Sequence, residues 1–151
     1  MTVLNIAMIG SDDLAKAIAK ATDQRDVHTY VHKESSADGP RILSIIRPAK
    51  MPERIRPFFN SLCAARVGLI EVSAIDATFG EVLVGFASAG ISKGIFVINP
   101  PQGEWIDEDQ VKAFIAQAGL SSWKQGSTDG IDLRDALYGL MDEISGDFES
   151  A

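Results

Sequence analysis

The chain has 151 residues, of which 46% are hydrophobic and 23% charged, a composition typical of one globular domain and not of a disordered chain. A formal net charge of −7 argues against a broad surface for nucleic acid, because such surfaces are basic. One cysteine, Cys63, excludes a disulfide framework. The apolar N-terminal run of about ten residues is too short to span a membrane, so we expect a cytoplasmic protein with no membrane contact.

The first half of the chain predicts a strand, a helix, a hairpin and a second helix. The short apolar run that ends at Gly10 is typical of a buried parallel strand. The turn-rich link Ser35–Pro40 is too short for a parallel crossover, so the strands on either side form a hairpin. The predicted elements are Val3–Ile9 (strand), Asp12–Thr22 (helix), Val27–Lys33 and Arg41–Arg47 (hairpin strands), and Met51–Ala64 (helix).

The second half predicts strands and helices in strict alternation. Gly90 is expected just past the end of one helix, and Asp107 at the start of the next. The predicted elements are Val67–Val72 (strand), Ala77–Ala89 (helix), Gly94–Ile98 (strand), Asp107–Gln117 (helix), Ser121–Lys124 (strand) and Asp132–Ile144 (helix, capped by Asp132). Both tryptophans, Trp105 and Trp123, are expected to be partly buried beside a helix.

This alternation implies an α/β domain with a mostly parallel sheet, helices on both faces and one antiparallel strand from the hairpin. We assign residues 1–145 to a single domain and 146–151 to a loose acidic tail. No metal site is expected, because His28 and His32 have no third ligand nearby in the sequence.

The segment after the first strand, G-S-D-D-L-A-K-A, partly matches the phosphate-binding P-loop G-x-x-x-x-G-K-[ST]. Gly10 and Lys16 are in register, whereas Ala15 replaces the second glycine and Ala17 replaces the Mg²⁺-binding hydroxyl. The alternative is a plain strand-turn-helix, with Asp12 or Asp13 as N-cap and Lys16 solvated.

Taken together, the later segments resemble the G domain of the translational GTPases. The similar proteins are elongation factor Tu, elongation factor 1-alpha and, most of all, the selenocysteine-specific elongation factors and their relatives in methanogenic archaea. The resemblance covers roughly residues 3 to 140 and is strongest over Arg66–Asn99, particularly in ASAGISKGIFVI. It implies a P-loop NTPase-like three-layer α/β/α fold, with a six-stranded, mostly parallel sheet in the order 2-3-1-4-5-6 and one antiparallel edge strand.

Carried over residue by residue, the family's motifs are mostly lost. The D-T-P-G-H motif falls at Arg47–Met51, where only a proline survives, and the first switch is reduced to Asp23–Asp26. The N-K-x-D motif falls at Asn99–Gln102, where Asn99 remains and Gln102 replaces the guanine-selecting Asp. The last base-contacting loop falls near Gly126–Thr128, and the residues that follow it are similar to the family's T-G-E-G-I-D.

The resemblance therefore implies a degenerate pseudo-GTPase related to protein biosynthesis, which acts as an interaction module in translation. No catalytic residue and no metal ligand is assigned, GTP hydrolysis is expected to be absent, and no cofactor is expected. A ribosome, tRNA or translation-factor partner follows by analogy. If a nucleotide binds at all, GTP or GDP would be held weakly and without Mg²⁺ by Gly10, Ser11, Lys16, Asn99 and Ser127.

Two other hypotheses stay open from the sequence. One is a nucleotide-binding protein of altered specificity, in which Gln102 would read another base. The other is a flavodoxin-like or Rossmann-type small-molecule domain, favoured by Gly10 and the acidic pair that follows it, but opposed by the predicted hairpin. Glu71 and Asp76, at the end of a predicted strand, are acidic candidates for a residual site with no assigned reaction.

Overall fold

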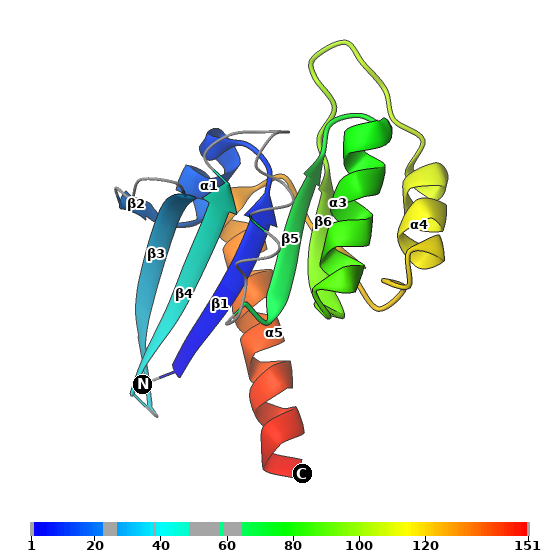
Figure 1. The fold of residues 1–151 in the computed structure, drawn as a ribbon. Helices are drawn as coiled ribbons and strands as arrows, with labels where there is room; N and C mark the ends of the chain where they lie inside the picture. The colour runs from blue at the N-terminus through cyan, green and yellow to red at the C-terminus, as the bar shows by residue number, and fades with distance from the viewer. Residues whose placement is uncertain (1, 23–26, 38, 49–57, 59–64, 151) are drawn as a thin grey trace.

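The computed structural model describes residues 2–22, 27–37, 39–48, 58 and 65–150. Its elements, in chain order, are β1 (Thr2–Ile9), α1 (Asp12–Ile18), β2 (Lys20–Thr22), β3 (Val27–Ser36), β4 (Gly39–Pro48), β5 (Val67–Val72), α3 (Ala77–Ser88), β6 (Lys93–Ile98), α4 (Glu108–Gln117), β7 (Lys124–Gln125) and α5 (Gly130–Ser150). The described strands form one seven-stranded sheet in the order β2-β3-β4-β1-β5-β6-β7 (Figure 1).

The six predicted strands occur in their predicted relative order, but the count of six was wrong. The additional strand β2 pairs antiparallel with β3, so the antiparallel strand of the hairpin is covered and β2 forms the edge. The prediction missed β2 because the helical spacing of Leu14, Ile18 and Ala21 extends the first predicted helix to Thr22. In the structure that helix, α1, ends at Ile18 and Ala19 is extended.

Contacts from α5 end α1 early. The Nε of Arg134 donates a hydrogen bond to the carbonyl oxygen of Ile18 at 2.7 Å, which satisfies a group that the helix end leaves unpaired. Gly130 lies directly against Ala17, since a Cβ on this glycine would come within 2.4 Å of the Ala17 carbonyl oxygen. The end of α1 thus depends on residues more than a hundred positions later in the chain, which a local pattern does not report.

The sheet is parallel at its centre and antiparallel at one side. β1 runs parallel to both β4 and β5, and β6 runs parallel to β5 and β7. β3 pairs antiparallel with β4 along their full length, from Val27 opposite Pro48 to Ser36 opposite Gly39. This strand order differs from those of the flavodoxin-like and the Rossmann sheets. It therefore excludes the hypothesis of a flavodoxin-like or Rossmann-type domain.

Two hydrophobic cores lie on opposite faces of the sheet, because successive side chains of each strand point to opposite faces. Leu4, Ile6 and Met8 of β1 pack on one face with α1 and α5. Ala7 and Ile9 pack on the other face with α3 and α4. The result is the predicted three-layer arrangement (Figure 1).

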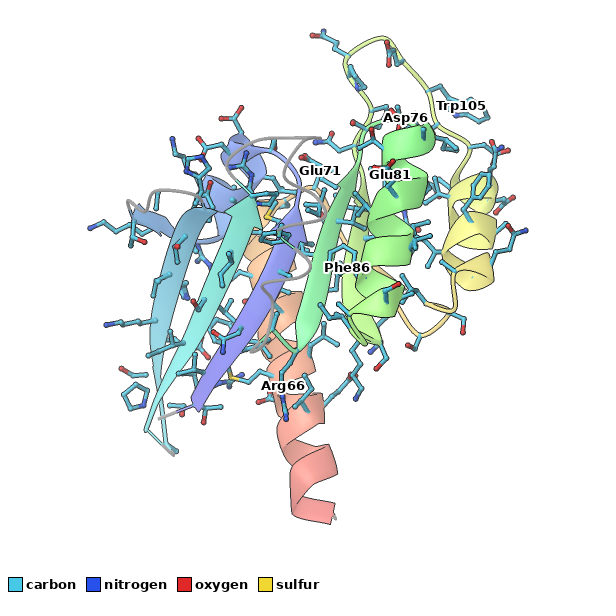
Figure 2. All side chains as sticks on the ribbon, viewed as in Figure 1. Arg66, Glu71, Asp76, Glu81, Phe86 and Trp105 are labelled. Atoms are coloured by element: carbon cyan, nitrogen blue, oxygen red, sulfur yellow. The ribbon has the colours of Figure 1, made fainter. Side chains whose placement is uncertain are left out.

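The two tryptophans have opposite environments. Trp123 is 5% exposed, as part of the core under α3 and α4, and its ring lies over Gly68 and Gly94, where a Cβ would meet it at 2.3 and 2.6 Å. Trp105 is 82% exposed. The expectation of partial burial was therefore wrong for Trp105, because the segment that carries it projects from the body of the protein (Figure 2).

The helix-start predictions succeed for α3 and α4 and fail for α5. Asp76 and Asp107 are the N-caps of α3 and α4, and Gly90 has the positive φ of 76° expected just past a helix end. The predicted cap Asp132 was wrong: α5 begins at Gly130, and the Asp129 carboxylate accepts from the Ile131 amide.

The remaining boundaries also differ from the prediction. The helical backbone of α5 continues past the predicted end at Ile144 and into the expected tail, and β7 is Lys124–Gln125 instead of Ser121–Lys124. The predicted helix Met51–Ala64, apart from its buried Phe58, and the predicted switch remnant Asp23–Asp26 lie outside the described residues. No helix in the described ranges is long and apolar enough to cross a membrane.

Candidate functional site

The segment that resembles a P-loop folds as a short turn followed by a helix. Only Gly10 and Ser11 separate β1 from α1, whereas a P-loop places several residues before its helix opens at the Gly-Lys pair. Ser11 is the N-cap, and its hydroxyl accepts a hydrogen bond from the Leu14 amide at 3.2 Å. Lys16 consequently lies inside α1. The alternative strand-turn-helix was right in kind, although the cap is Ser11 and neither Asp12 nor Asp13.

A polar network anchors the start of α1 to the hairpin. The buried Tyr30 hydroxyl donates to Asp12 at 2.7 Å and accepts from Arg47 at 3.0 Å. Lys16 forms an ion pair with the same carboxylate at 2.8 Å, and Arg47 also donates to the Gly10 carbonyl at 2.7 Å. By the resemblance, Arg47 merely replaces a motif Asp. In the structure it instead fixes the turn after β1.

The pKa shifts in this network follow from its contacts. The Lys16 hydrogen bond, followed by that from Tyr30, lowers the pKa of Asp12, and the same ion pair raises the pKa of Lys16. Burial is the main cause that raises the pKa of the Tyr30 hydroxyl, and the Asp12 hydrogen bond adds to it. At neutral pH, therefore, the lysine that would neutralise a phosphate already has a carboxylate partner.

Glu71 joins the ends of three neighbouring parallel strands. Its Oε1 accepts from the Ser11 amide at 2.7 Å, just after β1, and its Oε2 accepts from the Asn99 side-chain amide at 2.8 Å, just after β6. Gly10 is required beside it, because a Cβ at that position would come within 2.9 Å of the Glu71 Cβ. A free amide at a helix start is the usual partner of an anion. Here the carboxylate that accepts from this amide is the side chain of Glu71.

A cleft of about 650 Å³ opens at this edge of the sheet, where open α/β sheets bind ligands. Its floor is apolar, with Ile70, Phe79 and Val82 contributing, and Asp76 and Asn99 add polar groups. The full lining is Ile9, Gly10, Ser11, Ile70, Glu71, Val72, Ser73, Ala74, Asp76, Thr78, Phe79, Val82, Asn99, Pro100 and Pro101. Glu71 and Asp76 lie at the same end of β5 and α3 in Figure 2.

The structure brings together three of the five residues proposed to contact a nucleotide. Gly10, Ser11 and Asn99 all line the cleft. Lys16 points to Asp12 on α1 instead. The fifth, Ser127, precedes α5, where its hydroxyl accepts from the Asp129 amide. Ser127 is not among the residues that line the cleft, and its loop leads into Gly130, which packs on Ala17.

Tyr30 and Arg47 are the polar residues of this edge that the sequence does not single out. Alternation along the strand places Tyr30 between two histidines on one face, but it does not show which partner its hydroxyl reaches. Arg47 ends a strand, which is a weak signal for a position at the ligand edge. Within the described residues no group of His, Cys, Asp and Glu could hold a metal ion.

Comparison with known proteins identifies an archaeal relative of this chain. No protein-family profile matches the chain. Residues of this chain are 25% identical to the uncharacterized protein MJ0325 of Methanocaldococcus jannaschii over 141 residues, which is 93% of this chain. The match covers 43% of that protein, so the chain spans less than half the length of this relative.

Proposed function

We propose that this domain is a degenerate relative of the translational G domains, which acts as a protein-interaction module and does not hydrolyse GTP. The observation that carries the proposal is the Glu71 carboxylate on the Ser11 amide, at the turn where a G domain would bind phosphate. A nucleotide would have to displace this hydrogen bond and place its own negative charges beside Glu71.

The surrounding charges oppose a polyphosphate as well. Asp76 adds a second carboxylate to the cleft, and its oxygen is already used by the Phe79 amide at the start of α3. Lys16 would have to leave its ion pair with Asp12 to reach a phosphate. Each missing electrostatic contact to a transition state typically costs about 3 kcal/mol, so the loss of several such groups supports the absence of hydrolysis.

The scaffold itself supports an interaction role. The central strand order β3-β4-β1-β5-β6-β7 is the one that the resemblance implies, and only the added β2 departs from it. A fold does not fix a function, so the same scaffold can serve interaction without nucleotide chemistry. The proposed role of this domain in translation rests on the resemblance over Arg66–Asn99.

The experiment is a thermal-shift panel of GTP, GDP, ATP and guanosine tetraphosphate, each with and without Mg²⁺. We expect no nucleotide to raise Tm, because a ligand stabilises a protein only when it is present well above its Kd. Glu71→Gln removes the charge at the cleft and keeps the side-chain shape. A nucleotide that stabilises only this variant would identify the Glu71 carboxylate as the group that excludes phosphate.

Lys16→Ala, with Lys124→Ala as its matched control, tests the opposite result, in which a nucleotide does raise Tm. Both lysines are surface residues with one carboxylate partner each, but Lys124 lies on β7 and pairs with Glu143. A Mg²⁺-dependent shift in the native chain that disappears in Lys16→Ala and persists in Lys124→Ala would overturn the proposal. It would establish instead a nucleotide-binding domain of altered specificity.

A further inference from the structure

The segment between β6 and α4 displays an exposed tryptophan on a stiff support. Pro100 and Pro101 fix two backbone φ angles, and the Glu104 amide donates to the Pro101 carbonyl at 2.9 Å. Gly103, with a φ of 84°, occupies the position of this turn that requires a positive φ, as in a type II turn. Trp105 follows directly, so the ring is presented with little backbone freedom.

A groove of about 410 Å³ lies beside this ring and is called the Trp105 groove below. Ile98, Pro100 and Ile106 supply its apolar surface, and Ile106 is itself buried in the core. Three successive acidic residues, Asp107, Glu108 and Asp109, complete the lining. The groove thus combines an exposed aromatic ring, an aliphatic floor and an acidic rim.

The charge around the groove is strongly one-sided. Residues 67–112 contain two basic residues: Lys93, which begins β6 and therefore lies at the opposite edge of the sheet, and Lys112 of α4, for which the described residues show no ion pair with the acidic rim. The seven acidic residues of the same stretch are Glu71, Asp76, Glu81, Glu104, Asp107, Glu108 and Asp109. In Figure 2 Glu71, Asp76, Glu81 and Trp105 gather at one end of β5 and α3, whereas Arg66 lies at the other end.

Most of these carboxylates have no cationic partner. In the parts of the chain that the structure describes, no lysine or arginine forms an ion pair with Glu81, Glu104, Glu108 or Asp109. Asp107 uses one oxygen to cap α4. Clustered carboxylates repel one another, and a bound cation would relieve that repulsion.

We infer that the Trp105 groove docks a basic, arginine-containing segment of a partner protein. A guanidinium group can stack on the exposed Trp105 ring and at the same time donate hydrogen bonds to the acidic rim. The aliphatic floor receives the methylene stems of the same side chains. The inference rests on the proposed interaction role and gives the chemistry of its partner.

The same charges disfavour the other kinds of partner. A nucleic acid is a polyanion and would be repelled by the acidic rim. A second copy of this chain that docked groove to groove would bring two negative surfaces together. A basic polypeptide is attracted by the rim and can also fill the apolar floor.

The test uses dye-labelled hexaarginine, titrated into the purified chain at low ionic strength and followed by fluorescence anisotropy. We expect Glu104→Gln, Glu108→Gln and Asp109→Asn, combined in one variant, to weaken binding about tenfold, because two rim carboxylates and the charge of Glu104, next to Trp105 in the chain, are lost. Trp105→Ala should weaken it about threefold or more through the lost stacking. Hexalysine should bind more weakly than hexaarginine, since ammonium groups stack less well on an indole.

The matched control variant combines Asp13→Asn, Asp132→Asn and Asp135→Asn. These three residues are exposed and lie on α1 and α5, and their substitution changes the net charge by the same amount. We expect this variant to bind hexaarginine within about twofold of the native chain, because none of the three residues lines the Trp105 groove. Melting curves of all variants check that each one folds.

Three outcomes would overturn the inference: equal weakening by the two triple variants, unchanged affinity in Trp105→Ala, or displacement of the peptide by a single-stranded RNA oligonucleotide that binds the same groove. A failure of the docking inference can be distinguished from a failure of the proposed function. A chain that binds neither nucleotide nor hexaarginine contradicts only the docking inference, whereas a chain that hydrolyses GTP contradicts the proposed function whatever the peptide does.

Discussion

At the scale of single residues, the two alanines that differ from the P-loop pattern have structural roles. Ala15, in place of the second glycine, is fully buried in the core under α1. Ala17, in place of the Mg²⁺-binding hydroxyl, packs against Gly130. Converting this segment to a P-loop would therefore require more than changing two side chains, because both alanines pack against neighbouring parts of the fold.

The half-buried side chain of His32 makes the free energy of unfolding depend on pH. Its Nδ1 lies 2.8 Å from the Tyr138 hydroxyl on α5. Burial, followed by the positive charge of Arg134, lowers the pKa of His32 below 6.5, and Glu34 opposes this only in part. The unfolded chain therefore takes up the histidine proton at a higher pH than the folded chain does.

We predict that the free energy of unfolding is highest above about pH 6.5 and declines as the pH falls from there through the lowered pKa of His32. His32→Gln should flatten this part of the profile, whereas His28→Gln, an exposed position on the same strand, should leave it unchanged. Urea unfolding between pH 5 and pH 8 measures the effect. Identical profiles for the native chain and His32→Gln would contradict it.

At the scale of elements, the packing of β5 against β6 depends on a glycine pair beneath one indole ring. Gly68 and Gly94 are partners in the β5–β6 register, and Trp123 covers both of them. The ring also makes an edge contact with Phe86 of α3, with centroids 4.9 Å apart. Its indole nitrogen donates to the Ile91 carbonyl at 3.3 Å, so the buried polar group has a partner.

Gly94→Ala should destabilise the domain by about 1–3 kcal/mol or more, because the new Cβ has no space to occupy. It would come within 2.6 Å of both the Trp123 ring and the Gly68 carbonyl oxygen, and the latter is backbone that cannot move aside. Gly139→Ala is the control: nothing lies within 4 Å of its Cβ position on α5. That change should stabilise the domain by about 0.5–1 kcal/mol. Urea midpoints followed by circular dichroism compare the two.

At the scale of the whole molecule, charge is distributed unevenly along the chain. The net charge of −7 is concentrated in part around the carboxyl ends of β5 and β6, beside the exposed Trp105. The two tryptophans report on this asymmetry separately, because Trp123 is buried and Trp105 is not.

A negative potential around Trp105 should make caesium a better quencher of its fluorescence than iodide, because the cation accumulates there and the anion is excluded. We expect the difference to shrink at 1 M ionic strength, where charges are screened within about 3 Å. Trp105→Phe retains only Trp123, and its emission should resist both quenchers. Equal quenching by caesium and iodide at low salt would show that the acidic residues do not influence this surface.

Much of the architecture follows from local patterns. Apolar runs and turn signals predict six of the strands, and Asp107 marks a helix start, whereas the relative order of the strands was implied by the resemblance. These succeed because strand burial and N-capping depend on neighbours within a few positions. The candidate site was predictable only in part: Glu71 lies near the end of one predicted strand and Asn99 just after the next, at the same edge of the sheet, but nothing local shows that they bind each other.

The sequence by itself determined the alternation of strands and helices, the hairpin and the absence of most G-domain side chains. Only the tertiary structure decided where α1 ends, which tryptophan is exposed, and that Glu71 takes the Ser11 amide from 60 positions away. The reason is physical. Hydrophobic period and capping are encoded by adjacent residues, whereas a hydrogen bond between strand ends or a glycine under an indole ring exists only once remote elements have packed together.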